Sequence, residues 1–146
     1  MIRPYLNTDL ESLLAVMKLN IPDNFAPSEL DDLKTYVQNH SDTYFIMEED
    51  KSTVGGFGYK QPELSVAAIK WIFTHPAYKG KGLGGQAVNH CLELFQEKKD
   101  IHTVIVDTSQ LAYKFFAKFG FETISEEKDH WGKGLDLVKM KLNLQK

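Results

Sequence analysis

The sequence has 146 residues, of which 42% are hydrophobic and 25% charged, and its 17 basic and 20 acidic side chains leave a formal net charge of −3. This length is typical of one domain with one core, which we expect to cover residues 1–146, and so small a charge argues against electrostatic binding of nucleic acid or anionic membranes. The N-terminus lacks the apolar run of a signal peptide, and no segment approaches the ~20 apolar residues of a membrane span. The single cysteine cannot form an intrachain disulfide. We therefore expect a cytoplasmic protein.

Two helices are predicted in the first forty residues. Thr8 and Glu11 form a capping-box pattern, and the apolar residues that follow at helical spacing predict a helix over residues 8–19. A second helix is predicted over residues 28–39, where acidic residues occupy the first turn and complement the helix dipole.

Three strands are predicted next. Residues 44–48 and 54–59 are rich in aromatic and β-branched side chains and flank a charged turn of hairpin length, so we expect an antiparallel pair. Residues 65–74 form a longer strand that ends before Pro76, because proline cannot continue a central ladder.

Two further helices are predicted in the second half of the chain. From Gly84 onward, apolar residues trace one helical face as far as Phe95. Ser109 is a candidate cap for a fourth helix, which Gly120 ends.

The remaining strands complete a mixed sheet. Residues 103–106 form a buried strand, and residues 121–126 and 135–142 alternate as a final hairpin around a polar connection. The resulting order, ααβββ-loop-αβαββ, predicts an α/β fold of the α+β type, in which about four helices flank a central mixed sheet.

A glycine-rich loop joins the strand at 65–74 to the third helix. Glycines allow positive φ and close approach to a ligand, so several N–H groups can point at one anion. The helix that begins there adds its unpaired N–H groups and the positive end of its dipole, and two lysines add full charges. We therefore expect the loop to hold the pyrophosphate of a nucleotide-bearing cofactor; it reads Lys79-Gly80-Lys81-Gly82-Leu83-Gly84-Gly85.

Other nucleotide sites fit this loop less well. Gly80, Gly82 and Gly85 match the dinucleotide pattern G-x-G-x-x-G, and Asp107 ends the next strand, so a nicotinamide-dependent oxidoreductase stays open. That fold normally turns straight from strand to glycine, whereas five residues, 75–79, intervene here, and too little chain follows for a doubly wound sheet. A phosphate-loop NTPase is excluded because no Gly-Lys-Ser or Gly-Lys-Thr is present.

At these residues the sequence resembles the GNAT superfamily of N-acetyltransferases. The family's acetyl-CoA loop, Q/R-x-x-G-x-G/A, is similar to the segment from Lys79 to Gly84, which here follows Thr-His-Pro-Ala-Tyr. Lysine replaces the usual Gln or Arg at the first position, which keeps the positive charge and loses planar multidentate donation.

A second signature of that family, N-x-x-A-x-x-F-Y-x-x-x-G-F, is similar to residues 109–121. Ser109 stands where Asn often contacts the pantetheine arm of the cofactor, and Phe116 stands where Tyr often protonates the thiolate. Both residues are carried over as cofactor-binding positions.

The resemblance implies transfer of an acetyl group from acetyl-CoA to an amine of a small molecule or a peptide, by direct attack. It also implies backbone donors from a bulged strand, which the alignment places at Ile72, Phe73 and Thr74. A monomer or a homodimer is expected. A module that binds acetyl-CoA without turnover is the alternative, since Phe116 replaces the usual acid.

Candidate catalytic groups are few. Asp107, at the carboxyl end of its strand, is the candidate base, and either Tyr113 or a water molecule is the candidate acid. His75 is read as a solvated loop residue and Cys91 as a core residue. The five histidines show no metal-ligand spacing, so no metal is expected. The connection at residues 20–27 is the candidate lid of the acceptor pocket.

Overall fold

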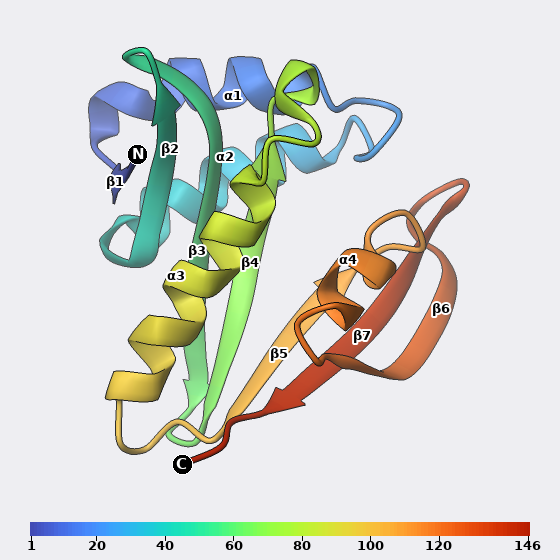
Figure 1. Ribbon diagram of the computed structural model, residues 1–146. Helices are drawn as coiled ribbons and strands as arrows, with labels where there is room; N and C mark the ends of the chain where they lie inside the picture. Colours follow the sequence, from blue (N-terminus) through green and yellow to red (C-terminus); the bar gives the residue numbers. More distant parts are fainter.

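The computed structural model describes residues 1–146 as a mixed seven-stranded sheet with helices on both faces (Figure 1). The α-helices are α1 (Leu10–Lys18), α2 (Glu29–Asn39), α3 (Leu83–Glu97) and α4 (Tyr113–Ala117), with short 3-10 turns η1 (Asn7–Asp9), η2 (Ser41–Thr43) and η3 (Pro76–Tyr78). The strands are β1 (Ile2–Pro4), β2 (Tyr44–Glu49), β3 (Ser52–Glu63), β4 (Val66–Thr74), β5 (Thr103–Thr108), β6 (Glu122–Gly132) and β7 (Leu135–Asn143).

The strands lie in the order β1-β2-β3-β4-β5-β7-β6. Every neighbouring pair is antiparallel except β4 and β5, which are parallel and are joined through α3. The predicted mixed sheet and the predicted sequence of helices and strands from residue 8 onward are therefore confirmed.

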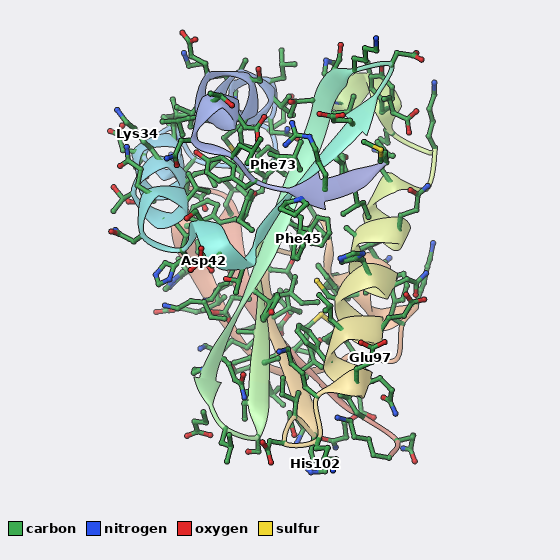
Figure 2. The ribbon with its side chains drawn as sticks, turned by 90° about the vertical axis from the view of Figure 1, so that its left-hand side faces the viewer. Lys34, Asp42, Phe45, Phe73, Glu97 and His102 are labelled. Atoms are coloured by element: carbon green, nitrogen blue, oxygen red, sulfur yellow. The ribbon has the colours of Figure 1, made fainter.

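The two faces of the sheet carry separate cores. Phe95, Cys91 and Val88 of α3 pack with Phe116 of α4 against one face. Leu13, Met17, Leu33 and Val37, from α1 and α2, pack with Tyr44, Ile46 and Phe73 against the other. Figure 2 shows α1 and α2 on the opposite side of the strands from α3. No helix has both the length and the apolar character needed to span a membrane.

Two corrections concern the N-terminus. The three-residue edge strand β1 is absent from the prediction, because so short a segment shows no periodicity; it pairs only with β2. The expected capping box of Thr8 and Glu11 is wrong. The chain enters α1 through η1, and the carboxylate of Asp9 accepts the Leu6 N–H at 2.7 Å.

Two more corrections concern the C-terminal third. The helix α4 has only five residues and does not begin at Ser109. The Ser109 carbonyl instead accepts hydrogen bonds from the Ala112 and Tyr113 N–H groups, which form turns before the helix. The strand β6 runs well beyond the predicted end at residue 126, and the connection to β7 shrinks to a turn at Gly134, whose φ is +81°.

The strands β4 and β5 stay paired for only part of their length. Their register runs from Val66 opposite Thr103 to Ile69 opposite Val106. The second half of β4 has no partner on the β5 side, and Figure 1 shows the two strands diverging there.

Candidate active site

The glycine-rich loop follows η3 and continues into the first turn of α3, at the end of β4 where β5 has diverged. Gly80 and Gly82 have φ of +84° and +78°, and a Cβ at either position would meet no atom within 4 Å. Conformation, rather than crowding, therefore requires glycine at both positions.

The N-terminus of α3 presents free backbone donors to this loop. Gly82 is the N-cap residue and carries no capping side chain, and the first intrahelical bond is donated by Gln86 to the Gly82 carbonyl. The N–H groups of Leu83, Gly84 and Gly85 thus have no partner within the helix. Unpaired donors and the positive dipole end together suit an anion.

Two lysines add positive charge to the loop. Lys79 and Lys81 are exposed, and neither forms an ion pair with a carboxylate. The ammonium of Lys81 lies 5.0 Å from the centre of the Tyr78 ring, a cation–π contact that leaves its charge uncompensated. The residues present therefore fit a pyrophosphate.

The start of α3 packs directly against α4. A Cβ on Gly84 would lie 3.1 Å from the Phe115 ring, and one on Gly85 would lie 3.8 Å from the ring of Phe119. These two glycines allow the helices to approach, which brings residues 109–121 beside the loop. Phe116 itself is a core residue, only 2% exposed and packed against Phe121.

A bulge interrupts β4 opposite Phe57. Gly56 pairs with Phe73 and Gly58 with Lys70, so one residue of β3 faces two of β4, Trp71 and Ile72. Trp71 has φ of +50°. A bulky side chain in this left-handed region costs about 1–2 kcal/mol, so surrounding contacts must hold it.

The backbone of β4 beyond the bulge points alternately to β3 and to the open side. The His75 N–H donates to the Val54 carbonyl of β3 at 2.7 Å. Because backbone groups alternate along a strand, Phe73 also faces β3, whereas Ile72 and Thr74 face the side from which β5 has diverged. Of the three predicted backbone positions, two thus face the open side of β4.

The two candidate catalytic side chains lie on opposite faces of the sheet. Tyr113 begins α4 and packs at the edge of the core beneath α3. Val106 belongs to that same core, so Asp107, the next residue of β5, points to the face that carries α1 and α2. Its carboxylate lies 3.8 Å from the ammonium of Lys139.

Several contacts at the rim are absent from the sequence prediction. The indole N–H of Trp131 donates to the Thr108 carbonyl at 3.1 Å, and the Gln110 amide donates to the Gly134 carbonyl at 2.6 Å. The turn between β6 and β7 is thereby tied to the end of β5. Contacts across such sequence separations leave no local pattern, so no motif could have indicated them.

The connection at residues 20–27 packs over the end of β4. The Asn20 side chain donates to the Thr74 carbonyl at 3.0 Å, and the rings of Phe25 and Phe73 meet edge to face at 6.2 Å. A Cβ on Gly132 would lie 3.1 Å from the Cβ of Ala26, so this connection also contacts β6. This connection therefore covers the C-terminal end of β4.

A buried carboxyl group lies where this connection enters α2. Glu29 is 6% exposed and accepts the Ala26 N–H at 2.7 Å. Burial raises the pKa of Glu29, while the Ala26 N–H and the neighbouring His130 partly oppose that rise.

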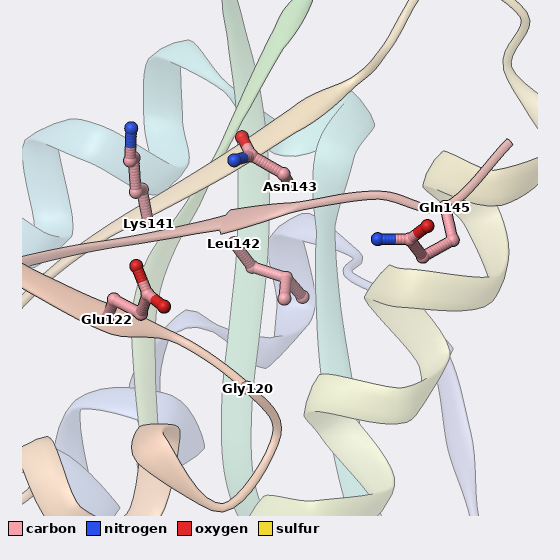
Figure 3. A pocket seen from close by; sticks show the side chains of 6 residues that line it. All are labelled: Gly120, Glu122, Lys141, Leu142, Asn143 and Gln145. Carbon is pink, nitrogen blue, oxygen red and sulfur yellow. The ribbon is translucent and has the colours of Figure 1, made fainter.

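Two surface hollows lie outside the glycine-rich loop. Asn143 of β7 pairs with Thr103 at the start of β5, so the hollow of about 270 Å³ in Figure 3 is at the other end of the sheet; it is lined by Gly120, Glu122, Lys141, Leu142, Asn143 and Gln145. The other, about 570 Å³, lies between α1 and the β2–β3 turn and reaches His75. Neither includes the glycine-rich loop.

Comparison with known proteins agrees with this geometry. A family model described as an acetyltransferase (GNAT) domain matches residues 18–144. The sequence is 29% identical to the L-2,4-diaminobutyric acid acetyltransferase of Vibrio cholerae over 89 residues, 58% of this chain and 51% of that protein. The match thus spans about half the length of this curated relative.

Solved structures share the fold at low sequence identity. Ard1 from Thermoplasma volcanium superposes with a TM-score of 0.84 at 14% identity, over 100% of this chain and 98% of that one. An aminoglycoside 6′-N-acetyltransferase solved with coenzyme A superposes with a TM-score of 0.79 at 12% identity, again over 100% and 98%.

Proposed function

This chain belongs to the GNAT acetyltransferase family, and on that premise we propose that it transfers the acetyl group of acetyl-CoA to a primary amine. The observation that carries the proposal is the placement of the glycine-rich loop, with its free helix N–H groups, beside the unpaired half of β4. One element offers donors to a pyrophosphate and the other offers an edge along which an extended pantetheine arm can lie.

The loop and α3 supply the anion site of this proposal. The N–H groups of residues 83–85 and the ammonium groups of Lys79 and Lys81 would hold the pyrophosphate. Ser109 would contact the pantetheine arm, while Phe116 shapes the site only through the core in which it is buried.

The backbone of β4 supplies the donors for the reaction. Acetyl-CoA brings a thioester whose carbonyl carbon a neutral amine attacks. The Ile72 N–H would stabilise the negative charge that develops on the carbonyl oxygen, and the Thr74 N–H would hold the arm further along the strand. As the C–N bond forms and the C–S bond breaks, the amine must lose a proton and the departing thiolate must gain one.

Asp107 and Tyr113 would divide these proton transfers between the two faces of the sheet. Asp107 points to the face that the lid at residues 20–27 covers, so it would take the proton of the incoming amine. Tyr113 lies on the side of α3 and α4, where the thiol would leave. A thiol has an ordinary pKa near 8.5, so its departure needs little assistance.

We propose small amines as the first acceptors to test, because the relative from Vibrio cholerae is named for L-2,4-diaminobutyric acid. The test incubates purified protein with acetyl-CoA and a panel of diamino acids, polyamines, aminoglycosides and peptides, and measures released CoA. Turnover on any of these amines supports the enzyme. Tight acetyl-CoA binding with no release on any of them would favour a binding module.

A further inference from the structure

The bulge in β4 is held by one buried side chain from β2. The hydroxyl of Tyr44 donates to the carbonyl oxygen of Trp71 at 2.7 Å, across a sequence separation of 27 residues. Tyr44 is 1% exposed, and burial raises its pKa well above the usual value, so the hydroxyl stays protonated and remains a donor.

Glycines of β3 make the slot in which Tyr44 lies. A Cβ on Gly56 would lie 2.7 Å from the Tyr44 hydroxyl oxygen, and one on Gly58 would lie 2.5 Å from its ring. Neither distance is compatible with a side chain larger than hydrogen. The spacing of these two glycines therefore serves the placement of the ring and its hydroxyl.

The bond to Trp71 also determines the direction of the next amide. Trp71 O and the Ile72 N–H belong to one planar trans peptide, so they point in opposite directions. With the carbonyl held toward Tyr44, the Ile72 N–H points away from it. That direction agrees with the strand alternation, which places Ile72 on the open side of β4.

We propose that Tyr44 is a positioning residue for acetyl transfer: its hydroxyl holds the Trp71–Ile72 peptide so that the Ile72 N–H faces the thioester carbonyl oxygen. This inference rests on the proposed function above. Tyr44 itself lies behind the strand and touches neither the acetyl group nor the amine. The left-handed φ of Trp71 is the backbone conformation that this hydrogen bond stabilises.

A neighbouring tyrosine provides a matched control. Tyr36 of α2 lies with its ring centre 6.4 Å from that of Tyr44, and its hydroxyl oxygen is buried with no hydrogen-bond partner. Tyr36→Phe and Tyr44→Phe therefore remove the same atom from the same core. Only the second removes a bond to the bulge.

The kinetic test measures kcat and KM for acetyl-CoA in both variants. Tyr44→Phe is expected to lower kcat at least tenfold, because a displaced oxyanion donor acts mainly in the transition state, and to leave KM for acetyl-CoA within twofold. Tyr36→Phe is expected to match the parent protein. A kcat for Tyr44→Phe within twofold of the parent, or an equal loss in Tyr36→Phe, overturns the proposal.

A second readout does not depend on turnover. The backbone amide resonance of Ile72 is expected to move in Tyr44→Phe more than the resonances of its neighbours, and to stay in place in Tyr36→Phe. An unchanged Ile72 resonance in folded Tyr44→Phe overturns the positioning role. Absence of CoA release by the parent protein would instead count against the proposed function, and the amide shift would still decide the role of Tyr44.

Discussion

A Cβ added at Gly82 would contact no atom of the protein, but we expect it to interfere with acetyl-CoA binding. An alanine there must adopt a φ near +78° and adds a Cβ beside the free N–H groups of α3. Gly82→Ala is expected to weaken acetyl-CoA binding at least fivefold by calorimetry.

Gly134→Ala is the control for that substitution. Gly134 has φ of +81° and equally open surroundings, but it lies in the turn between β6 and β7. Both variants are expected to lose about 1 kcal/mol of stability from backbone strain, and only Gly82→Ala should bind less tightly. Equal weakening in both variants would show a general effect of destabilisation.

Glu29 gives a prediction on pH. Because the pKa of Glu29 is raised in the folded protein, folding favours the protonated carboxyl group. The stabilisation from this group is complete below its ordinary pKa near 4.5 and is lost as the pH rises through its pKa in the folded protein. Glu29→Gln keeps an acceptor for the Ala26 N–H and cannot ionise. We expect equal urea midpoints at pH 4 and a higher midpoint for the variant at pH 8.

Asp31 is the control for Glu29. It lies exposed in the same turn of α2, so Asp31→Asn should show no gain in midpoint at pH 8. A midpoint difference between Glu29→Gln and the parent that stays constant from pH 4 to pH 8 would contradict the assigned cause.

The glycines of the loop could be identified from the sequence, because only glycine adopts positive φ readily. The roles of Trp71 and Tyr44 could not be identified in this way. Tryptophan at positive φ runs against its ordinary preference, and the bond that holds it joins two strands that the sequence predicts separately.

Ion pairs connect the edge strand β1 to its neighbours. Its Arg3 bonds Asp9 through two nitrogens, at 2.7 and 2.8 Å, and Glu48 of β2 at 2.6 Å. The bidentate pair with Asp9 links β1 to η1, and the single bond to Glu48 links it to β2.

Asp9→Asn is expected to destabilise the protein by about 2 kcal/mol at pH 7, the usual worth of a charged hydrogen bond. The Arg3 hydrogen bond lowers the pKa of Asp9 in the folded protein. The stabilisation from the Asp9 carboxylate is therefore present above its ordinary pKa near 3.8 and is lost as the pH falls through its pKa in the folded protein. The difference in urea midpoint between Asp9→Asn and the parent protein should therefore become smaller below pH 3.8.

The exposed pair of His130 and Glu127 is the comparison for that loss. Its partners are 40% and 63% exposed, so Glu127→Gln should change stability by less than about 0.5 kcal/mol. A loss as large as that of Asp9→Asn would show that burial does not decide the strength of these pairs.

Elements with a clear period were predictable, and short or interrupted ones were not. The apolar stripes of α1, α2 and α3 extend over two or more turns, which is enough to define them. The strand β1 and the helix α4 are too short for that. The length of β6 depends on its pairing with β7, which continues past residue 126 through exposed polar residues.

In the whole molecule, one hydrophobic core packs on each face of the sheet, and the strands β4 and β5 diverge within the sheet between these two cores. A ligand that fills this separation binds only the folded protein and must stabilise it. Acetyl-CoA at 100 times its Kd is expected to raise Tm by roughly 5–10 °C, which corresponds to about 2.7 kcal/mol.

NADH under the same conditions is the negative control and should leave Tm unchanged. A larger shift with NADH than with acetyl-CoA would overturn the cofactor assignment. The sequence allowed both readings at the loop, since Gly80, Gly82 and Gly85 match the dinucleotide pattern while Gly82 and Gly84 match the acetyl-CoA pattern. The antiparallel first half of the sheet separates them, because a doubly wound fold needs parallel strands there.

The buried Cys91 has a practical consequence for the assay of CoA release. It is the only thiol of the chain, it is fully buried, and burial raises its pKa to about 12. A thiol-specific chromogenic reagent added to the folded protein should therefore register only the sulfhydryl of liberated coenzyme, with no background from the protein. The same reagent in denaturant should titrate one group per chain, so its slow reaction without denaturant would report spontaneous opening of the core beneath α3.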